Sequence, residues 1–247
     1  MSNKTDRQHW EQHHASAVFR IAPCSDIIRR WIESFVPPDC NKAHSCIVIG
    51  CCPGRYLAVA GELGYELSGV DFAENIELMT EWLRNCNYRV GKFWRGDFFS
   101  IDYARTFDLV LSFGFVEHFS NWREVLLRHT DLVASNGLLL VEAPNFMGRF
   151  QRLIHYHLDR ANFDRHHIPA MDVEAWSSIL RDAGFEILFE GYFGRFNYWV
   201  EAQPRTFLQR AALSVLQRLR SPLRRILPPD RKLYSPVCGI VARRIGR

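Results

Sequence analysis

Short apolar runs alternate with helical patterns through much of the chain, and this alternation constrains the fold more than any other feature. Runs typical of buried strands lie at 46–49, 66–70, 90–94, 107–113 and 137–143. Helical patterns are predicted at 56–63, 73–85 and 122–133. Each strand–helix–strand unit requires a crossover that leaves the two strands parallel. The sequence therefore predicts an α/β fold, a Rossmann-like parallel sheet with helices on both faces.

Further segments are predicted on both sides of this strand–helix pattern. A helix capped by Ser25 precedes the first strand, and we expect residues 1–38 to form an N-terminal helical extension placed to cap a pocket. Residues 39–247 are predicted to form one domain with substrate-side insertions at about 145–172 and 204–232. After residue 144 no regular element is predicted until a helix at 173–183. A strand is then expected at 185–189 and an antiparallel last strand at 237–242.

Targeting and redox features are scarce in the sequence. The first ten residues are polar, and no apolar run reaches the ~20 residues needed to cross a bilayer. The chain has seven cysteines, with no Cys-x-x-Cys pair that would suggest a structural zinc site. We therefore predict a cytoplasmic protein whose cysteines are mostly small buried hydrophobes.

A Gly-rich turn follows the first predicted strand. It reads Gly50-Cys51-Cys52-Pro53-Gly54, and the second strand ends at Asp71. In nucleotide-binding folds an acid at this distance accepts hydrogen bonds from ribose hydroxyls. Cys52 and Arg55 stand where the dinucleotide fingerprint requires glycine, so nicotinamide and flavin cofactors are disfavoured. The pattern indicates a different nucleotide-like cofactor.

Taken in order, these segments resemble the class I S-adenosylmethionine-dependent methyltransferase family. The resemblance covers about residues 40–145, and more faintly 172–190 and 237–243. It rests on the Gly-rich turn, on Gly-Val-Asp at 69–71, on Arg-Gly-Asp-Phe at 95–98 and on the run 107–119. It implies S-adenosyl-L-methionine as cofactor, with ribose bound at Asp71 and adenine at Asp97. The cofactor-binding residues that it implies are Gly50, Cys51, Cys52, Gly54, Asp71, Phe72, Asp97, Phe98, Ser112, Phe113 and Gly114.

The sequence departs from the family signature acid-x-Gly-x-Gly-x-Gly at two positions. Val48 occupies the position of the acid, and Cys52 that of the second glycine. These departures motivate an alternative, a methyltransferase-like fold that has lost catalysis and binds a partner. A second alternative is an RNA methyltransferase, although Ser112-Phe113-Gly114-Phe115 replaces the Asn/Asp-Pro-Pro-aromatic motif often used for base amines.

Histidines are the candidate catalytic residues. Methyl transfer to a hydroxyl needs a base near neutral pKa, and histidine suits this role. His118 follows the fourth strand, at the sheet edge where ligands bind, and His167 lies in the loose segment before the helix at 173–183. Because no carboxylate accompanies the histidines at helical ligand spacing, we predict no metal. The prediction is O-methylation of a small molecule, lipid or saccharide.

The C-terminal part of the chain is strongly basic. Residues 204–247 contain eleven Lys and Arg against one acid, and 205–220 has the pattern of an amphipathic helix. Leu208, Ala212, Val215, Leu216 and Leu219 fall on one face, and Ser221-Pro222 is expected to interrupt the helix. Three interpretations remain open: core packing, peripheral contact of 205–227 with an anionic membrane, and nucleic-acid binding, which is disfavoured. The sequence leaves the oligomeric state undetermined.

Overall fold

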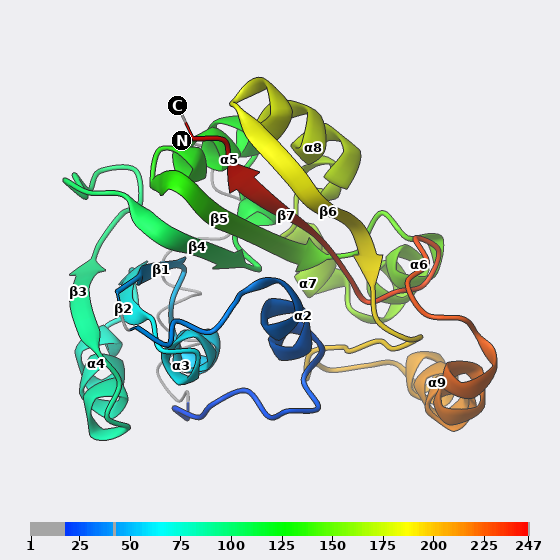
Figure 1. The fold of residues 1–247 in the computed structure, drawn as a ribbon. Coiled ribbons are helices and arrows are strands. Elements are labelled where there is room, and N and C mark those ends of the chain that lie inside the picture. Colours follow the sequence, from blue (N-terminus) through cyan, green and yellow to red (C-terminus); the bar gives the residue numbers. More distant parts are fainter. Residues whose placement is uncertain (1–17, 42, 247) are drawn as a thin grey trace.

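The structure, a computed structural model, describes residues 18–41 and 43–246. Its centre is a seven-stranded sheet with the order β3-β2-β1-β4-β5-β7-β6 (Figure 1). The strands are β1 Ser45–Ile49, β2 Glu66–Asp71, β3 Val90–Arg95, β4 Phe107–Phe113, β5 Val133–Pro144, β6 Phe185–Phe193 and β7 Val237–Arg244. The α-helices are α2 Ile27–Phe35, α3 Arg55–Glu62, α4 Ile76–Asn85, α5 Trp122–Thr130, α6 Arg149–Leu158, α7 Arg160–Asp164, α8 Val173–Asp182 and α9 Phe207–Ile226. Two short 3₁₀ segments are η1 Val116–His118 and η2 Ile168–Met171.

Strand directions confirm the predicted fold class. Strands β1 to β5 pair in parallel, as crossover connections through helices require. Strand β7 inserts between β5 and β6 and runs antiparallel to both. The sheet is thus Rossmann-like with an antiparallel last strand.

Helices cover both faces of the sheet and enclose two apolar layers (Figure 1). On one face Trp31 of α2, Leu57 of α3 and Met79 of α4 belong to one buried cluster. On the other face Val125 of α5 and Trp176 of α8 belong to a second. The central strands are apolar on both sides because both faces are buried.

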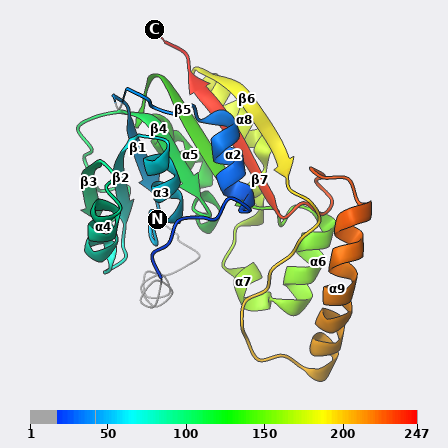
Figure 2. The ribbon, with the colours of Figure 1, turned by 60° about the horizontal axis from the view of Figure 1, so that its bottom comes forward.

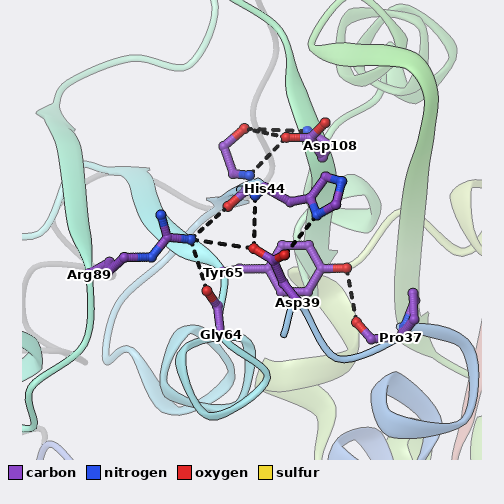
Figure 3. A network of polar contacts seen from close by, with 8 residues as sticks. Pro37, Asp39, His44, Gly64, Tyr65, Arg89 and Asp108 are labelled. Carbon is purple, nitrogen blue, oxygen red and sulfur yellow. Dashed lines mark hydrogen bonds and ion pairs between the residues drawn. The ribbon is translucent and has the colours of Figure 1, made fainter. Parts of the chain in front are cut away.

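A polar network ties the amino ends of the strands (Figure 3). The buried carboxylate of Asp39 accepts a 2.8 Å hydrogen bond from the His44 backbone N–H and lies 3.4 Å from an Arg89 guanidinium nitrogen. Burial raises the pKa of Asp39, but the hydrogen bonds from His44 outweigh it and lower that pKa. Asp108 accepts hydrogen bonds from the backbone N–H and hydroxyl of Ser45, at 2.8 and 2.9 Å. Ligands of open α/β sheets bind at the carboxyl ends of strands, so this network is structural.

Several predicted boundaries were wrong. The N-cap of α2 is Asp26 rather than Ser25, since its carboxylate accepts from the amides of Ile28 and Arg29. Helix α5 ends at Thr130, because Val133 already pairs with Phe107 in the sheet. Residues 145–172 are largely helical, with α6, α7 and η2 where no regular element was predicted. The predicted extension at 1–38 is described only from residue 18 onward, where it contains α2, and its earlier part lies outside the described residues.

Helices α6, α7 and α9 lie together at one end of the sheet (Figure 2). The side chain of Gln151 on α6 donates to the carbonyls of Asn197 and Tyr234, at 2.6 and 2.9 Å. Asn145 donates to the carbonyls of Lys232 and Ser235, at 2.8 and 2.9 Å. The first predicted insertion is therefore bound through side-chain amides to the segments that flank the second, and to Lys232 at its end.

Helix α9 also differs from its predicted form. It continues through Pro222 as one helix, and no residue of it is fully buried. Leu216 of the predicted face packs with Leu213 and Leu223 against the small cluster beneath the helix. Leu208, Val215 and Leu219 of that face are exposed, so the packed face coincides with the predicted one only in part. Among the described residues, no helix combines the length and apolar character needed to cross a membrane.

Candidate functional site

A cavity of about 550 Å³ opens at the carboxyl ends of the parallel strands. It lies where strand order reverses between β1 and β4, the usual ligand position in doubly wound sheets. Its volume is that of a site for a drug-sized ligand. The lining residues are Gly50, Cys52, Val70, Asp71, Phe72, Gly96, Asp97, Phe98, Phe99, Ser100, Phe113, Gly114, Phe115, His118 and Phe119.

The Gly-rich turn brings backbone close to the cavity. The N–H groups of Gly50 and Cys51 both donate to the carbonyl of Val70, at 3.0 and 3.2 Å. Gly54 has φ +83°, and a Cβ there would lie 2.8 Å from the sulfur of Met79. A side chain at this position would be strained by the backbone and would clash with α4. This glycine allows α3 to start directly after the turn.

Asp71 is the best-positioned polar side chain of the cavity. One carboxylate oxygen accepts from the Cys52 N–H and the other from the Ala73 N–H, each at 2.9 Å. Burial raises the pKa of Asp71, while these amides lower it, and the net shift is upward. Each carboxylate oxygen can accept a second hydrogen bond. The side chain is therefore held rigidly and can still receive hydroxyl groups from a ligand.

The third strand and the loop after β4 supply a second acid and an aromatic wall. Asp97 accepts from the Phe99 N–H at 3.0 Å, which fixes the turn after β3. Phe98 packs edge-on against Phe115, with ring centroids 5.7 Å apart, and Phe115 packs on Phe119 at 5.0 Å. A flat apolar ligand group could pack here against aromatic side chains, with the carboxylate of Asp97 nearby as a hydrogen-bond acceptor.

A buried histidine–carboxylate cluster borders the cavity at η1. His118, which lines the cavity, packs against His166 with the two rings tilted by 44° and their centroids 4.7 Å apart. Glu117, beside His118 in the chain, is fully buried, and neither of its carboxylate oxygens has a hydrogen-bond partner. One ligand-type atom from each of Glu117, His118 and His166 lies within 4.8 Å of the others.

Burial shifts the acid–base behaviour of this cluster. It raises the pKa of Glu117 to about 8 and lowers that of His166 to about 4. Burial, and then the nearby Glu117, also raise the pKa of Glu142 on β5. Two carboxyl groups and two imidazoles therefore share one low-dielectric region beside the cavity.

Most of the predicted site residues line this cavity. Those that do are Gly50, Cys52, Asp71, Phe72, Asp97, Phe98, Phe113, Gly114 and His118. Gly54, Cys51, Ser112 and His167 are not among the lining residues: Gly54 is the N-cap of α3, and Cys51 and Ser112 are buried in the core. His167 contributes its backbone N–H, which donates to the carbonyl of Glu117 at 2.6 Å.

The chain is dense in aromatic residues between 191 and 199, and none of them lines the cavity. Phe193 stacks on Trp31 of α2, with centroids 4.7 Å apart. Phe196 and Tyr198 belong to the small cluster beneath α9. These aromatic side chains therefore pack against α2 and beneath α9 and do not form part of the cavity.

Some lining residues were absent from the prediction. Phe99 and Ser100 directly follow the predicted pair Asp97-Phe98. Phe115 directly follows the predicted Gly114, and Phe119 directly follows the predicted His118. Proximity to a predicted motif was the available signal for these four. His166 and Glu117 were not predicted as site residues, because only the fold brings their side chains together.

The sequence matches a family model described as "Methyltransferase domain" over residues 18–189. A search of the curated proteins finds no match. The family match spans the whole cavity and the sheet up to the middle of β6.

Solved structures with a similar fold come from several microorganisms. A SAM-dependent methyltransferase from Archaeoglobus fulgidus is 20% identical, with a TM-score of 0.57 over 88% of this chain and 93% of its own. The YcgJ protein of Bacillus subtilis is 13% identical, with a TM-score of 0.59 over 88% and 97%. Magnesium protoporphyrin IX methyltransferase from Synechocystis PCC 6803, solved with SAH, is 14% identical, with a TM-score of 0.51 over 88% and 80%. At these identities the similarity is one of fold.

Proposed function

The chain belongs to the class I S-adenosylmethionine-dependent methyltransferases, and on this premise we propose that it methylates a hydroxyl oxygen of a small-molecule, lipid or saccharide acceptor. Its cofactor is S-adenosyl-L-methionine. The observation that carries the proposal is one cavity that joins a rigid carboxylate, Asp71, to a polar end at His118.

The donor set of the cavity fits this cofactor. Ribose hydroxyls need an acceptor, and Asp71 offers a carboxylate already oriented by two amides. The adenine ring needs apolar surface and an acceptor for its amino group, which Phe98, Phe99 and Asp97 supply. Gly50, Gly96 and Gly114 leave the backbone accessible along the cavity wall. We propose that these residues hold the cofactor.

When bound, the cofactor supplies an activated methyl group on a sulfonium, so the protein's task is binding, alignment and proton management. In the overall reaction the acceptor oxygen gains the methyl carbon and loses its proton. The Nδ1 atom of His118 lies 3.3 Å from the carbonyl of Arg165, and a carbonyl only accepts. Nδ1 therefore carries the proton and the lone pair is on Nε2. We place acceptor activation at this imidazole, at the polar end of the cavity.

Calorimetric titration with S-adenosylhomocysteine, with NADH as the control ligand, tests the cofactor site. We expect micromolar binding of the first and none of the second, because the turn lacks the dinucleotide glycines. Transfer of labelled methyl to hydroxylated acceptors then tests the reaction. If neither ligand bound, the alternative of a methyltransferase-like binding protein would replace this proposal.

We also propose that α9 rests on an anionic membrane surface, which would suit an amphiphilic acceptor. Leu208, Val215, Leu219 and Ile226 recur at intervals of seven, four and seven, so they share one helix face. All four are exposed, Leu208 and Ile226 by 77% and 78%. Residues 205–227 carry six arginines and no acid: Arg205, Arg210, Arg218, Arg220, Arg224 and Arg225. An exposed apolar stripe with a basic surround matches the chemistry of an anionic bilayer surface.

Cosedimentation with phosphatidylglycerol vesicles tests this surface. We expect the double variant Val215→Asp/Leu219→Asp to bind the vesicles several-fold more weakly, because charges cannot enter the acyl boundary. The matched control Ser214→Asp/Gln217→Asp adds the same charge to exposed positions off the stripe. An equal loss of vesicle binding in both double variants would show that the effect comes from the change in net charge alone. Salt-sensitive binding to RNA in place of vesicles would favour a nucleic-acid partner instead.

A further inference from the structure

We propose that Glu117, His118 and His166 bind a divalent transition metal ion, of the zinc type, at the edge of the cofactor cavity. The ion's proposed use, holding an acceptor oxygen, rests on the function proposed above. In the metal-bound form the ion would activate the acceptor in place of the Nε2 lone pair of His118, which then binds the ion. Binding of the ion itself does not depend on that function.

The three side chains converge from two separate segments. Glu117 and His118 belong to η1, and His166 follows α7. One ligand-type atom from each lies within 4.8 Å of the others. Around a tetrahedral zinc, with bonds near 2.0–2.1 Å, ligand atoms are roughly 3.4 Å apart. The present spacing of at most 4.8 Å therefore exceeds that of a zinc site by no more than about 1.4 Å.

Hydrogen bonds to backbone carbonyls favour the tautomer of both imidazoles in which Nδ1 is protonated and Nε2 can bind a metal. The Nδ1 atom of His166 lies 2.7 Å from the carbonyl of Asn162, and that of His118 lies 3.3 Å from the carbonyl of Arg165. Because carbonyls only accept, each Nδ1 donates and each Nε2 carries the lone pair. Metal-binding histidines characteristically donate their other N–H to a carbonyl or carboxylate in this way.

Glu117 provides the observation that points to a cation. Its side chain is fully buried, and both carboxylate oxygens lack a hydrogen-bond partner. Its neighbour Glu142 is also a buried acid, so two carboxyl groups lie close together here and each disfavours the charged form of the other. A buried carboxylate persists when paired with a cation or when protonated. Among the ion pairs formed by the described residues, none includes Glu117.

Ligand chemistry selects the type of metal. Two imidazoles and one carboxylate suit zinc and its transition-metal relatives, whereas magnesium and calcium prefer oxygen ligands alone. Zinc with three protein ligands keeps an open coordination position. His118 lines the cavity, so that position is adjacent to the acceptor. The sequence predicted no metal because no carboxylate stands at helical ligand spacing from the histidines. His166 lies 48 residues from His118, so local spacing does not reveal this group of ligands.

Cobalt(II) is the probe for this site, because its visible absorption reports ligand type and geometry without any enzymatic assay. The full-length protein, stripped with a chelator, is titrated with cobalt and then with zinc as competitor. We expect one equivalent to bind with a tetrahedral-type spectrum, and zinc to displace it. Metal content of the untreated protein, by mass spectrometry, provides an independent measurement.

Variants locate the ion. Glu117→Gln, His118→Ala and His166→Ala should each weaken cobalt binding at least ~10- to 100-fold, the loss typical of perturbed metal sites. His157→Ala is the matched control, because His157 is exposed on α6. Glu117→Gln is nearly isosteric, and circular dichroism checks that each variant is folded.

Three outcomes would overturn the proposal: no stoichiometric cobalt or zinc binding, binding unchanged in the three variants, or an intense thiolate-to-cobalt band lost in Cys52→Ser. The last would place the ion at Cys51, Cys52 and Asp71, the other group of ligand atoms within reach of one ion. Titration of the same samples with S-adenosylhomocysteine separates the two proposals. Metal binding without cofactor binding would retain this site and reject the proposed function, and the reverse result would do the opposite.

Discussion

Replacement of Asp71 by alanine is expected to weaken S-adenosylhomocysteine binding by roughly 5- to 150-fold, which corresponds to about 1–3 kcal/mol. The ligand's ribose hydroxyls would lose a charged acceptor. The N–H groups of Cys52 and Ala73 would lose their 2.9 Å partners at the same time, so the Gly-rich turn would also loosen. Isothermal titration calorimetry of the variant and the unchanged chain measures the ratio directly.

Glu74→Ala is the matched control for Asp71→Ala. Glu74 is an exposed acid three residues away that pairs with Arg95 at 3.2 Å and does not line the cavity. Its removal changes the net charge equally, and we expect the dissociation constant to stay within about twofold, because an exposed pair is worth little. Asp71→Asn keeps the side-chain volume should the alanine variant fold poorly. An unchanged dissociation constant in both Asp71 variants would overturn the ribose assignment.

The sheet was predictable because its strands are buried on both faces. Runs such as 107–113 are apolar almost throughout, and the strand was found with the bounds that the structure has. Strand β6 continues to Phe193, beyond the predicted 189, because its later residues pair with β7. Pairing across the sheet, rather than local composition, sets that boundary.

Helix α6 was missed because it buries polar side chains. Gln151 and His155 on α6 are fully buried, so the helix lacks a continuous apolar stripe. Gln151 donates to two backbone carbonyls, and His155 lies 3.1 Å from the buried carboxylate of Asp159. Hydrogen bonding compensates for the burial of these groups, and a reading of apolar periodicity cannot detect it.

The residues of the candidate site also fall into two groups: those that a local sequence pattern predicts and those that only the fold brings together. Gly50 and Asp71 were found because a turn and a strand end are local features with a fixed distance between them. Val48, the departure from the family signature, is a buried core residue and does not line the cavity. The side chains of Glu117 and His166 are brought together only by the fold, and no local pattern in the sequence connects them.

Acid is expected to destabilise the protein through His129, a buried histidine beneath the aromatic wall. Burial lowers its pKa from the ordinary 6.5 to about 4, although a hydrogen bond to Val125 opposes the shift. Its Nε2 has no partner, and its ring packs against Phe98 and Phe115, with centroids 5.0 and 5.9 Å away. Protonation would place a charge in this apolar layer, directly behind the cavity.

The sign of the effect follows from proton uptake. Between pH 6.5 and 4 the unfolded chain binds a proton at His129 and the folded chain does not, so stability falls as the pH is lowered through this window. By pH 4.5 the loss attributable to this residue is about 2–3 kcal/mol. Urea unfolding at pH 7 and pH 4.5 measures it, with His129→Phe as the variant that cannot take up the proton.

We expect His129→Phe to retain more of its neutral-pH stability at pH 4.5 than the unchanged chain, by that same amount. Other buried groups, including His166, titrate in the same range and contribute equally to both proteins, so the difference between the two pH slopes isolates His129. The exposed His157→Ala variant should keep the original slope. Parallel slopes for His129→Phe and the unchanged chain would show that His129 accepts its proton as readily in the folded protein as in the unfolded one. The aromatic wall would then have to admit water or a counter-charge at this ring, and the cavity beside it would be more polar than its lining residues indicate.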